Sequence, residues 1–300
     1  MISIVIIVKN DPKLEDTLYA LQKITKPEET EIIVIDASTK DFGIREKFQD
    51  VKYIPFKGDG VKRYTIPEQR NAGINSAKGD IIVFIDSSCI PTDEWLVELV
   101  KPIREESEEI VSGSTFSTNK QTLNDLDHIK KAGLKYIEEC ATINLAFKKS
   151  LTEKIGMFDE RFDYGSDVDF SWRVRDAGVN IRYAPSAKIT HDWGDVNQEF
   201  KRTLVYGQAR ARLYLKHRNR IQSIPSIDPV MFVYPILIVS SPGILLIPWF
   251  WLAFILINIL LVIKNIKDPK PVYIIVKHYI YGFGVLKEIV RHIFKQGYGS

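Results

Sequence analysis

The stretch GDIIVFIDSSCIP, residues 79–91, decides the fold class of this chain of 300 residues. Its apolar run at 81–85 is typical of a strand that is covered on both faces of a sheet. The run ends on Asp86, and the next two positions are Ser87 and Ser88. Ligands of open α/β sheets bind beyond the carboxyl ends of the strands. A carboxylate at the end of a buried strand therefore indicates a binding site at that edge.

The first hundred residues alternate between strand and helix patterns. Apolar runs at 2–8, 31–36 and 51–56 predict three more strands, and helices are predicted over 11–24, 66–79 and 92–103, the last capped by Thr92 or Asp93. This alternation predicts an α/β fold with a mostly parallel, doubly wound sheet and helices on both faces. Asn10 and Asp36 then lie at the same sheet edge as Asp86.

The second hundred residues are less regular. We expect a strand at 108–115, a helix over 122–140, a strand leading into a helix over 140–156, and a helix over 164–178 that Gly178 stops. A pair of strands is expected over 179–194, and a long basic helix over 197–220. Its basic side chains, with Arg210 and Arg212, could contact a diphosphate or face anionic lipid, and most of them are expected to face lipid.

Charge is unevenly distributed along the chain. Residues 1–200 carry 27 Lys and Arg against 35 Asp and Glu, whereas residues 201–300 carry 14 against 3. We expect one domain over 1–220 and a membrane-associated helical region over 221–300, with anionic membrane lipids as partners. The sequence has no basic-aromatic RNA motif and no zinc-finger spacing, so nucleic acid is not an expected partner.

The 34 residues from 230 to 263 contain no charged side chain. A membrane-spanning helix needs about 20 apolar residues, and SSPG at 240–243 would break this run into two arms. Basic residues on both flanks favour a hydrophobic hairpin at about 230–263 with both ends in the cytoplasm. The segment at about 271–296 has the pattern of an amphipathic interfacial helix. We therefore expect the cell membrane as the location, with the first domain on its cytoplasmic face.

Four sequence pieces, in this order, resemble the family 2 glycosyltransferases with the GT-A fold. They are VKND at 8–11 with EIIVIDAS at 31–38; RNAGINSAKGDIIVFIDSSC at 70–89; YGSDVDFSWRVRDAG at 164–178; and KITHDWG at 188–194 leading into YGQARARLYLKH at 206–217. The resemblance covers about residues 1–220. It implies the transfer of a sugar from a nucleotide-diphosphate sugar.

The resemblance also implies a divalent metal, Mn²⁺ or Mg²⁺, that bridges the diphosphate oxygens. Asp86 matches the first position of the family's DXD motif, whose last position is here Ser88, and His191 matches a late histidine that often completes the metal site. An imidazole suits Mn²⁺ better than Mg²⁺. Contacts with the nucleotide are implied for six residues: Val8, Asn10, Asp36, Arg70, Asn71 and Asp86.

For the catalytic base the resemblance points to Asp167, which would take the proton of the acceptor hydroxyl in an inverting transfer. Asp169 would support the acceptor. The family usually has a glutamate before this aspartate, whereas this chain has Ser166. From the local pattern alone, Ser166 would instead cap a helix, with Asp167 and Asp169 as charges that complement its dipole.

The expected function is a membrane-attached, inverting transfer of a single sugar to a lipid-linked or cell-envelope glycan. The QxxRW signature of processive synthases is absent from the sequence, which favours single transfer. A polyprenyl-phosphate sugar synthase is a close alternative. A nucleotide- or glycan-binding pseudoenzyme is another, since Ser88 and Ser166 stand where acids are usual. A dinucleotide oxidoreductase would need G-x-G-x-x-G after the first strand, where VKNDPK stands.

Overall fold

The computed structural model describes residues 1–57, 65–118, 133–243, 249–264 and 270–296. The chain has two compact units, Met1–Asp195 and Val196–Ser300. The boundary falls at Asp195 rather than near residue 220, because the basic helix of residues 196–216 packs against the C-terminal helix and so belongs to the second unit.

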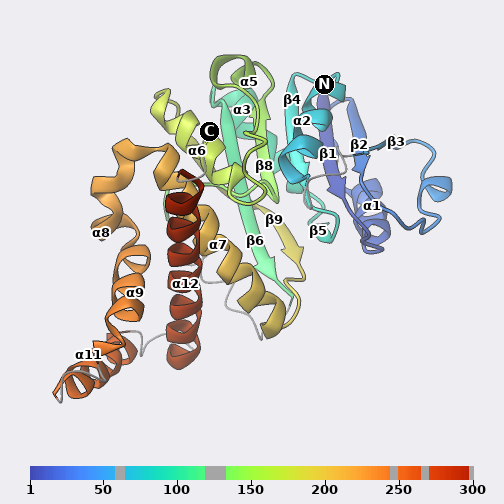
Figure 1. Ribbon diagram of the computed structural model, residues 1–300. Coiled ribbons are helices and arrows are strands. Elements are labelled where there is room, and N and C mark those ends of the chain that lie inside the picture. The colour runs from blue at the N-terminus through green and yellow to red at the C-terminus, as the bar shows by residue number, and fades with distance from the viewer. Residues whose placement is uncertain (58–64, 119–132, 244–248, 265–269, 297–300) are drawn as a thin grey trace. The chain divides into compact units, whose positions relative to one another are not determined.

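Nine described strands of the first unit form one sheet in the order β3-β2-β1-β4-β8-β6-β9-β5, and β7 pairs with β9 (Figure 1). Their bounds are β1 (Ile2–Val8), β2 (Thr30–Asp36), β3 (Lys52–Pro55), β4 (Ile81–Ile85), β5 (Cys89–Pro91), β6 (Ile110–Ser117), β7 (Tyr136–Ile137), β8 (Asn144–Lys148) and β9 (Ile181–His191). The parallel pairs β1–β2, β1–β4 and β2–β3 confirm the predicted parallel sheet for this half.

The other half of the sheet is mixed, so the expectation of a mostly parallel sheet is wrong there. β8 runs antiparallel to both β4 and β6, and β5 and β7 run antiparallel to β9. The strand–helix alternation on which the expectation rested stops after α3 (Trp95–Glu105). This helix begins after Glu94, without a side-chain cap from Thr92 or Asp93.

Helices cover both faces of the sheet, as predicted, because each buried strand sends alternate side chains to opposite sides. In β1, Ile4 and Ile6 belong to one core cluster, which includes residues of α1 (Leu14–Lys23) and α3. Val5 lies in a second cluster with residues of α2 (Ile66–Ser76), α5 (Ser150–Ile155) and α6 (Ser166–Asp176). A short 3₁₀ helix, η1 (Arg45–Lys47), lies between β2 and β3.

Two other elements differ from the sequence-based expectations. The helix expected over 122–140 lies outside the described residues as far as 132, and its remainder contains the short strand β7. The pair of strands expected over 179–194 is one continuous strand, β9. It stays continuous because β6 pairs with it along both halves, with a shift of register between Gly113 and Ser114.

A buried asparagine joins β8 to that irregularity. Asn144 is 1% exposed, and its amide donates to the carbonyl oxygens of Ser114 and Ala187, both at 2.9 Å. Its side-chain oxygen accepts from the indole N–H of Trp95 at 2.8 Å. One side chain thus supplies partners for backbone groups at an irregular point of the ladder and for the largest aromatic residue of α3.

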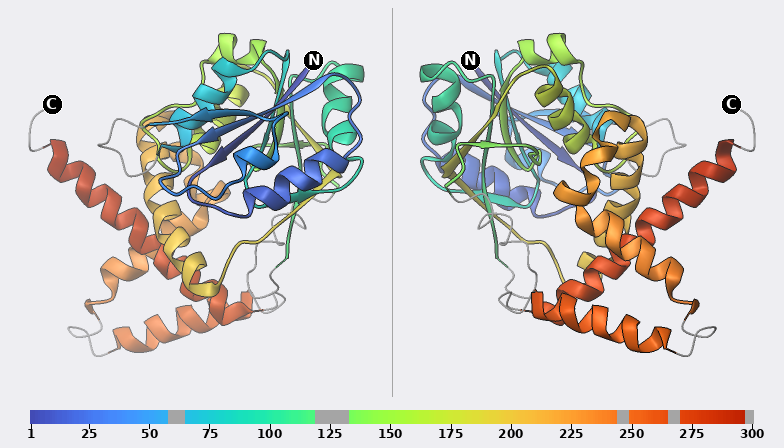
Figure 2. Two further views of the ribbon diagram at one scale, coloured as in Figure 1. Left: turned by 90° about the vertical axis from the view of Figure 1, so that its right-hand side faces the viewer. Right: turned by 90° about the vertical axis from the view of Figure 1, so that its left-hand side faces the viewer.

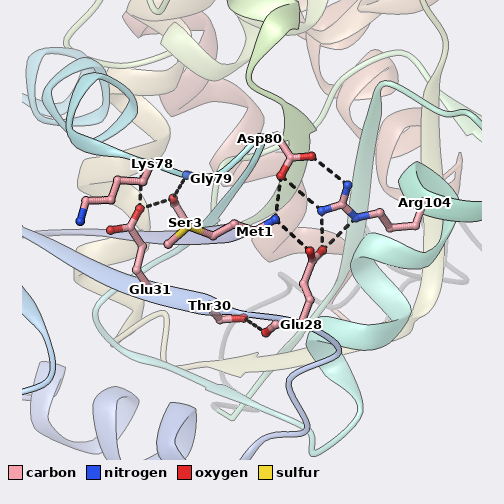
Figure 3. A network of polar contacts seen from close by, with 9 residues as sticks. All are labelled: Met1, Ser3, Glu28, Thr30, Glu31, Lys78, Gly79, Asp80 and Arg104. Carbon is pink, nitrogen blue, oxygen red and sulfur yellow. Dashed lines mark hydrogen bonds and ion pairs between the residues drawn. The ribbon is translucent and has the colours of Figure 1, made fainter.

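A charged network fixes the amino ends of the central strands (Figure 3). The amino terminus of Met1 lies 2.9 Å from carboxylate oxygens of both Glu28 and Asp80, and the guanidinium of Arg104 binds the same two carboxylates. Burial raises the pKa of Glu28, but the bonds from the amino terminus and Arg104 outweigh it, so the pKa is lowered. The network ties the start of β1 to the segments before β2 and β4 and to α3.

The second unit is helical: α7 (Val196–Lys216), η2 (Arg218–Ser223), α8 (Ile224–Ile227), α9 (Pro229–Ser240), α11 (Phe250–Lys264) and α12 (Pro271–Gln296). Within it, α12 lies against α7 and α9 (Figure 2). Glycines permit the close approach, since a Cβ at Gly207 would lie 2.1 Å from the carbonyl oxygen of Tyr281, and one at Gly284 would lie 2.2 Å from that of Leu204. α12 confirms the helix expected at about 271–296.

Two basic side chains of α7 that were expected from the sequence to face lipid form ion pairs within the second unit. Arg210 lies 3.3 Å from Asp228, and Arg212 lies 3.3 Å from Glu288. These two arginines therefore hold α7 to its neighbours instead, and the expectation for them is wrong.

The apolar run of residues 230–263 forms two helices, α9 and α11, while residues 244–248 of the expected hairpin lie outside the described part. No single described helix is both long and apolar enough to cross a membrane. Taken together, residues 218–227 and 229–240 pass that test by length and composition, but the pair is bent by 83°.

Replacing Asn144 with leucine should lower the free energy of unfolding by about 3 kcal/mol, because it leaves an indole N–H and two carbonyls without their partner. Urea denaturation measures the effect. The exposed Asn75→Leu on α2 is the control and should change stability by about 0.5 kcal/mol or less. A loss below about 1 kcal/mol for Asn144→Leu would mean that the asparagine does not support the irregular ladder.

Candidate active site

The carboxyl ends of three parallel strands meet at one edge of the sheet. Val8 of β1 pairs in register with Asp36 of β2, and β4 ends beside them just before Asp86. The edge thus gathers polar residues that the sequence spreads over some 80 positions. This is the juxtaposition predicted from the strand pattern.

A pocket of about 340 Å³ opens at this edge. It is lined by residues from the ends of β1 and β2, from the segment 38–46 and from β3, and these include Val8, Asp36 and Tyr53. The Asp36 carboxylate accepts the backbone N–H of Ser38 at 2.8 Å, which fixes it at the pocket wall. Two of the predicted nucleotide contacts, Val8 and Asp36, therefore lie in one cavity.

Asn10, a third predicted contact, shapes this pocket through the backbone. It has a left-handed conformation with φ of 55°, which asparagine tolerates better than most residues. Its side-chain oxygen accepts the backbone N–H groups of Thr39 and Lys40 at 2.9 and 3.1 Å, and its own N–H donates to Ser38. The side chain holds the loop after β2 in place, and its contact with a nucleotide stays a prediction.

Tyr53 is a pocket residue that the sequence reasoning missed. Its hydroxyl is buried and has no hydrogen-bond partner among the described residues. Burial, together with the charge of Asp36, raises its pKa to about 12, so the group is a neutral donor. The sequence pattern marks Tyr53 only as a residue of a strand. What distinguishes it in the structure is a buried hydroxyl without a partner among the described residues.

Asp86 lies at the centre of the edge. Burial raises the pKa of its carboxyl, Arg70 and His191 oppose the rise, and the negative charges of Asp167 and Asp11 add to it. Asp11 was also missed from the sequence, although it follows directly on Asn10. A cation that binds beside it stabilises a carboxylate that is crowded by like charges.

Ser88 and His191 come together across more than a hundred residues, because Cys89 of β5 pairs with His191 of β9. The hydroxyl oxygen of Ser88 lies 2.9 Å from Nε2 of His191. The Trp193 ring lies against the imidazole, with 4.5 Å between centroids. The two predicted metal ligands therefore occupy adjacent positions beyond the end of β4.

These residues fit a divalent cation. Two ligand atoms about 2.1 Å from an octahedral ion lie about 3 Å apart, which is the separation of Ser88 Oγ and His191 Nε2. Asp86 is close enough to His191 for their charges to interact. Carboxylate, hydroxyl and imidazole together suit Mn²⁺. Among the described residues, no group of three or more His, Cys, Asp or Glu side chains is placed to hold a metal ion.

Arg70 and Asn71, adjacent on α2, play different parts. The Arg70 guanidinium donates to the Ser166 hydroxyl at 2.8 Å and lies over the Phe158 ring, 5.3 Å from its centroid. The side-chain NH₂ of Asn71 donates to the carbonyl oxygen of Phe158 at 2.9 Å and to the carboxylate of Glu160. The side-chain oxygen of Asn71 accepts the backbone N–H of Phe158 at 3.0 Å. Asn71 thus positions the aromatic ring beside Arg70, and its predicted nucleotide contact stays a prediction.

Asp167 and Asp169 diverge at the start of α6. The Asp167 carboxylate is half-buried and accepts the N–H of Val168 at 2.9 Å, and it lies near enough to Arg70 for their charges to interact. Asp169 is fully buried and forms an ion pair with Arg173 at 2.9 Å. Asp167 joins the site. The contacts of Asp169 instead hold Arg173, which binds the backbone of residues 155–157.

Removing the unpaired hydroxyl by Tyr53→Phe should leave the stability of the ligand-free protein unchanged or slightly higher, because no described hydrogen bond is lost. Urea denaturation again gives the comparison. The matched control is Thr17→Val, whose buried hydroxyl donates to the carbonyl of Ser87 at 2.9 Å, and which should cost about 1 kcal/mol. Equal losses for the two variants would show that the Tyr53 hydroxyl has a partner.

Comparison with known proteins agrees with this geometry. The family model described as glycosyl transferase family 2 matches residues 3–165, which is more than half of the chain. The chain is 23% identical over 238 residues to glycosyltransferase AglE of Haloferax volcanii, covering 74% of this chain and 77% of that protein. It is 26% identical over 168 residues to a pre-mycofactocin glycosyltransferase of Mycobacterium tuberculosis, covering 50% of this chain and 35% of that one.

Two solved structures share the fold. The mannosyltransferase PcManGT from Pyrobaculum calidifontis, in complex with GDP-Man and Mn²⁺, has a TM-score of 0.66 at 15% identity and covers 96% of this chain and 86% of its own. GalNAc-T7, with UDP, GalNAc and Mn²⁺, has a TM-score of 0.54 at 16% identity, and the match covers 71% of this chain and 49% of that one. The fold is thus the GT-A fold expected from the sequence. The chain belongs to glycosyl transferase family 2 and is a glycosyltransferase that uses a nucleotide-sugar donor.

Proposed function

We propose that the chain is an inverting glycosyltransferase that moves one sugar from a nucleotide-diphosphate sugar to a lipid-linked or cell-envelope glycan, at the cytoplasmic face of the cell membrane. One observation carries this proposal: Asp86, Asp167 and Arg70 lie within electrostatic reach of one another, at the strand edge that also holds the pocket. The arrangement provides for a cation, a base and a donor.

In this proposal the pocket beside Asp36 takes the nucleoside, and the donor's diphosphate lies toward Asp86. A divalent cation held by Asp86, Ser88 and His191 would neutralise charge on the diphosphate. The acceptor hydroxyl attacks the anomeric carbon, and its proton passes to the Asp167 carboxylate. The bond from that carbon to the β-phosphate oxygen breaks, and its electron pair leaves with the nucleoside diphosphate.

The proposed attachment to membranes rests on the surface of α11. Eight of its large apolar side chains are between 40% and 56% exposed: Trp251, Leu252, Ile255, Leu256, Ile257, Ile259, Leu260 and Ile263. The opposite face, with Phe254, Leu261 and Val262, packs against residues of α9 and α12. A helix of 15 residues is about 22 Å long, shorter than the bilayer core of about 30 Å. We therefore propose that α11 lies in the membrane interface.

Asp167→Asn should reduce kcat by about 10²–10⁴-fold, the usual contribution of a general base. The assay is release of nucleoside diphosphate by the detergent-solubilised protein, with Mn²⁺ or with EDTA, from a panel that includes GDP-mannose and UDP-linked sugars. Asp176→Asn, at the other end of α6, is the control. A mild effect of Asp167→Asn would favour a phosphate acceptor, as in a polyprenyl-phosphate sugar synthase. A failure to bind any nucleotide would favour the pseudoenzyme.

The double variant Ile255→Glu with Leu256→Glu should lower binding to vesicles at least tenfold, because charges replace apolar groups at the interface. Flotation with vesicles of phosphatidylcholine, with and without phosphatidylglycerol, measures it. Leu134→Glu, at an exposed apolar position of the first unit, should bind as the unaltered protein does. Equal binding by all three proteins would rule out α11 as the attachment site.

A further inference from the structure

Arg70 is a buried cation whose hydrogen-bonding capacity is largely unused. Arg70 is only 8% exposed. A guanidinium has five N–H donors, and the only hydrogen bond it makes to described residues goes to the Ser166 hydroxyl, at 2.8 Å. No nitrogen of Arg70 is among the fully buried, unpartnered atoms of the described residues, so its remaining N–H groups reach the surface and are available to a ligand. A guanidinium that is held in place while its other donors stay available is suited to bind an anionic ligand.

Ser166 is the partner that leaves the charge of Arg70 uncompensated. It is 1% exposed and begins α6, after Gly165 in the left-handed conformation with φ of 83°. A hydroxyl accepts a hydrogen bond without neutralising the guanidinium, whereas a carboxylate at this position would form a bidentate ion pair. The Phe158 ring supports the same guanidinium from another side. Ser166 and Phe158 therefore orient Arg70 without consuming its charge.

The charge is directed at the site described above. Burial lowers the pKa of Arg70, while Asp167 and Asp86 oppose that effect, so both carboxylates lie near it. Neither forms an ion pair with it in the described part of the chain. Arg70 is thus near both the side chain proposed to hold the cation and the one proposed as the base. In the transfer, the β-phosphate and the sugar of the donor lie between those two groups.

We propose that Ser166 is a positioning residue, which holds the Arg70 guanidinium so that its remaining N–H groups bind the β-phosphate of the donor. The inference rests on the proposed function of this site. When the bond from the anomeric carbon to the β-phosphate oxygen breaks, negative charge grows on that phosphate. A pre-positioned guanidinium then stabilises the transition state more than the ground state.

The test compares nucleoside diphosphates with monophosphates, because only the former have a β-phosphate. Titration calorimetry with GDP, GMP, UDP and UMP in the presence of Mn²⁺ gives the dissociation constants. Ser166→Glu, which would pair with Arg70, and Arg70→Gln should each weaken diphosphate binding at least 30-fold and change monophosphate binding less than threefold. Ser166→Thr, which keeps a hydroxyl, should restore most of the diphosphate affinity. kcat should fall in Ser166→Glu and recover in Ser166→Thr.

Two further variants separate positioning from folding. Ser166→Ala removes the hydroxyl without adding volume or charge, and it should weaken diphosphate binding by a smaller factor than Ser166→Glu. Ser114→Ala removes a different buried hydroxyl, which donates to Pro185, and it should leave the ratio of the two affinities unchanged. Urea denaturation identifies any variant that does not fold.

The outcomes distinguish this inference from the proposed function. If the unaltered protein binds diphosphates but Ser166→Glu and Arg70→Gln weaken both nucleotide classes equally, the inference is overturned and the proposed function stands. If Ser166→Glu keeps the full affinity for diphosphates, the inference is likewise overturned and the proposed function stands. If the unaltered protein binds no nucleotide, both fall.

Discussion

The parallel pairing of β1 with β2 and with β4 is the constraint on which the site depends. Strands that run in the same direction end at the same edge, so the carboxylates that follow them must meet there. Asp36, which lines the pocket, and Asp86 come to the same edge of the sheet through this pairing. The charged network around Met1 and Arg104 anchors the opposite ends of the same strands. The pocket thus lies at the carboxyl ends of these strands, while ion pairs join the elements at their amino ends.

The balance of charge at this edge shows why two serines are compatible with catalysis. The charges of Asp86 and Asp167 act on the guanidinium of Arg70, and Asp11 adds a third negative charge near Asp86. Acids at positions 88 and 166 would raise the negative charge further and would bind the histidine and Arg70 in ion pairs. Ser88 and Ser166 make hydrogen bonds to the same two groups and leave their electrostatic effect intact. In the proposed function, an incoming cation would then supply positive charge that the site itself lacks.

The second unit is held together by features that sequence hydropathy does not reveal. Gly207 and Gly284 let α7 and α12 approach to backbone contact, and Glu199, 3% exposed, binds Lys277 and Tyr273 between those two helices. These contacts pair charged and polar side chains of the two helices with each other. The apolar side chains of α11 remain exposed. A monomeric soluble protein rarely leaves so many large apolar groups on one element, which is the physical basis for proposing a membrane there.

The sequence by itself determined the strands of the first half, the residues at their ends and the family resemblance. These are local properties, because buried strands need continuous apolar runs and the polar residue that follows is fixed by the chain. Only the tertiary structure decided that Ser88 meets His191, that Ser166 meets Arg70, and that Tyr53 has a buried hydroxyl in the pocket. It also reversed the strand direction in the second half of the sheet. Those outcomes depend on contacts between residues far apart in the chain, and such contacts have no periodicity that a local pattern can report.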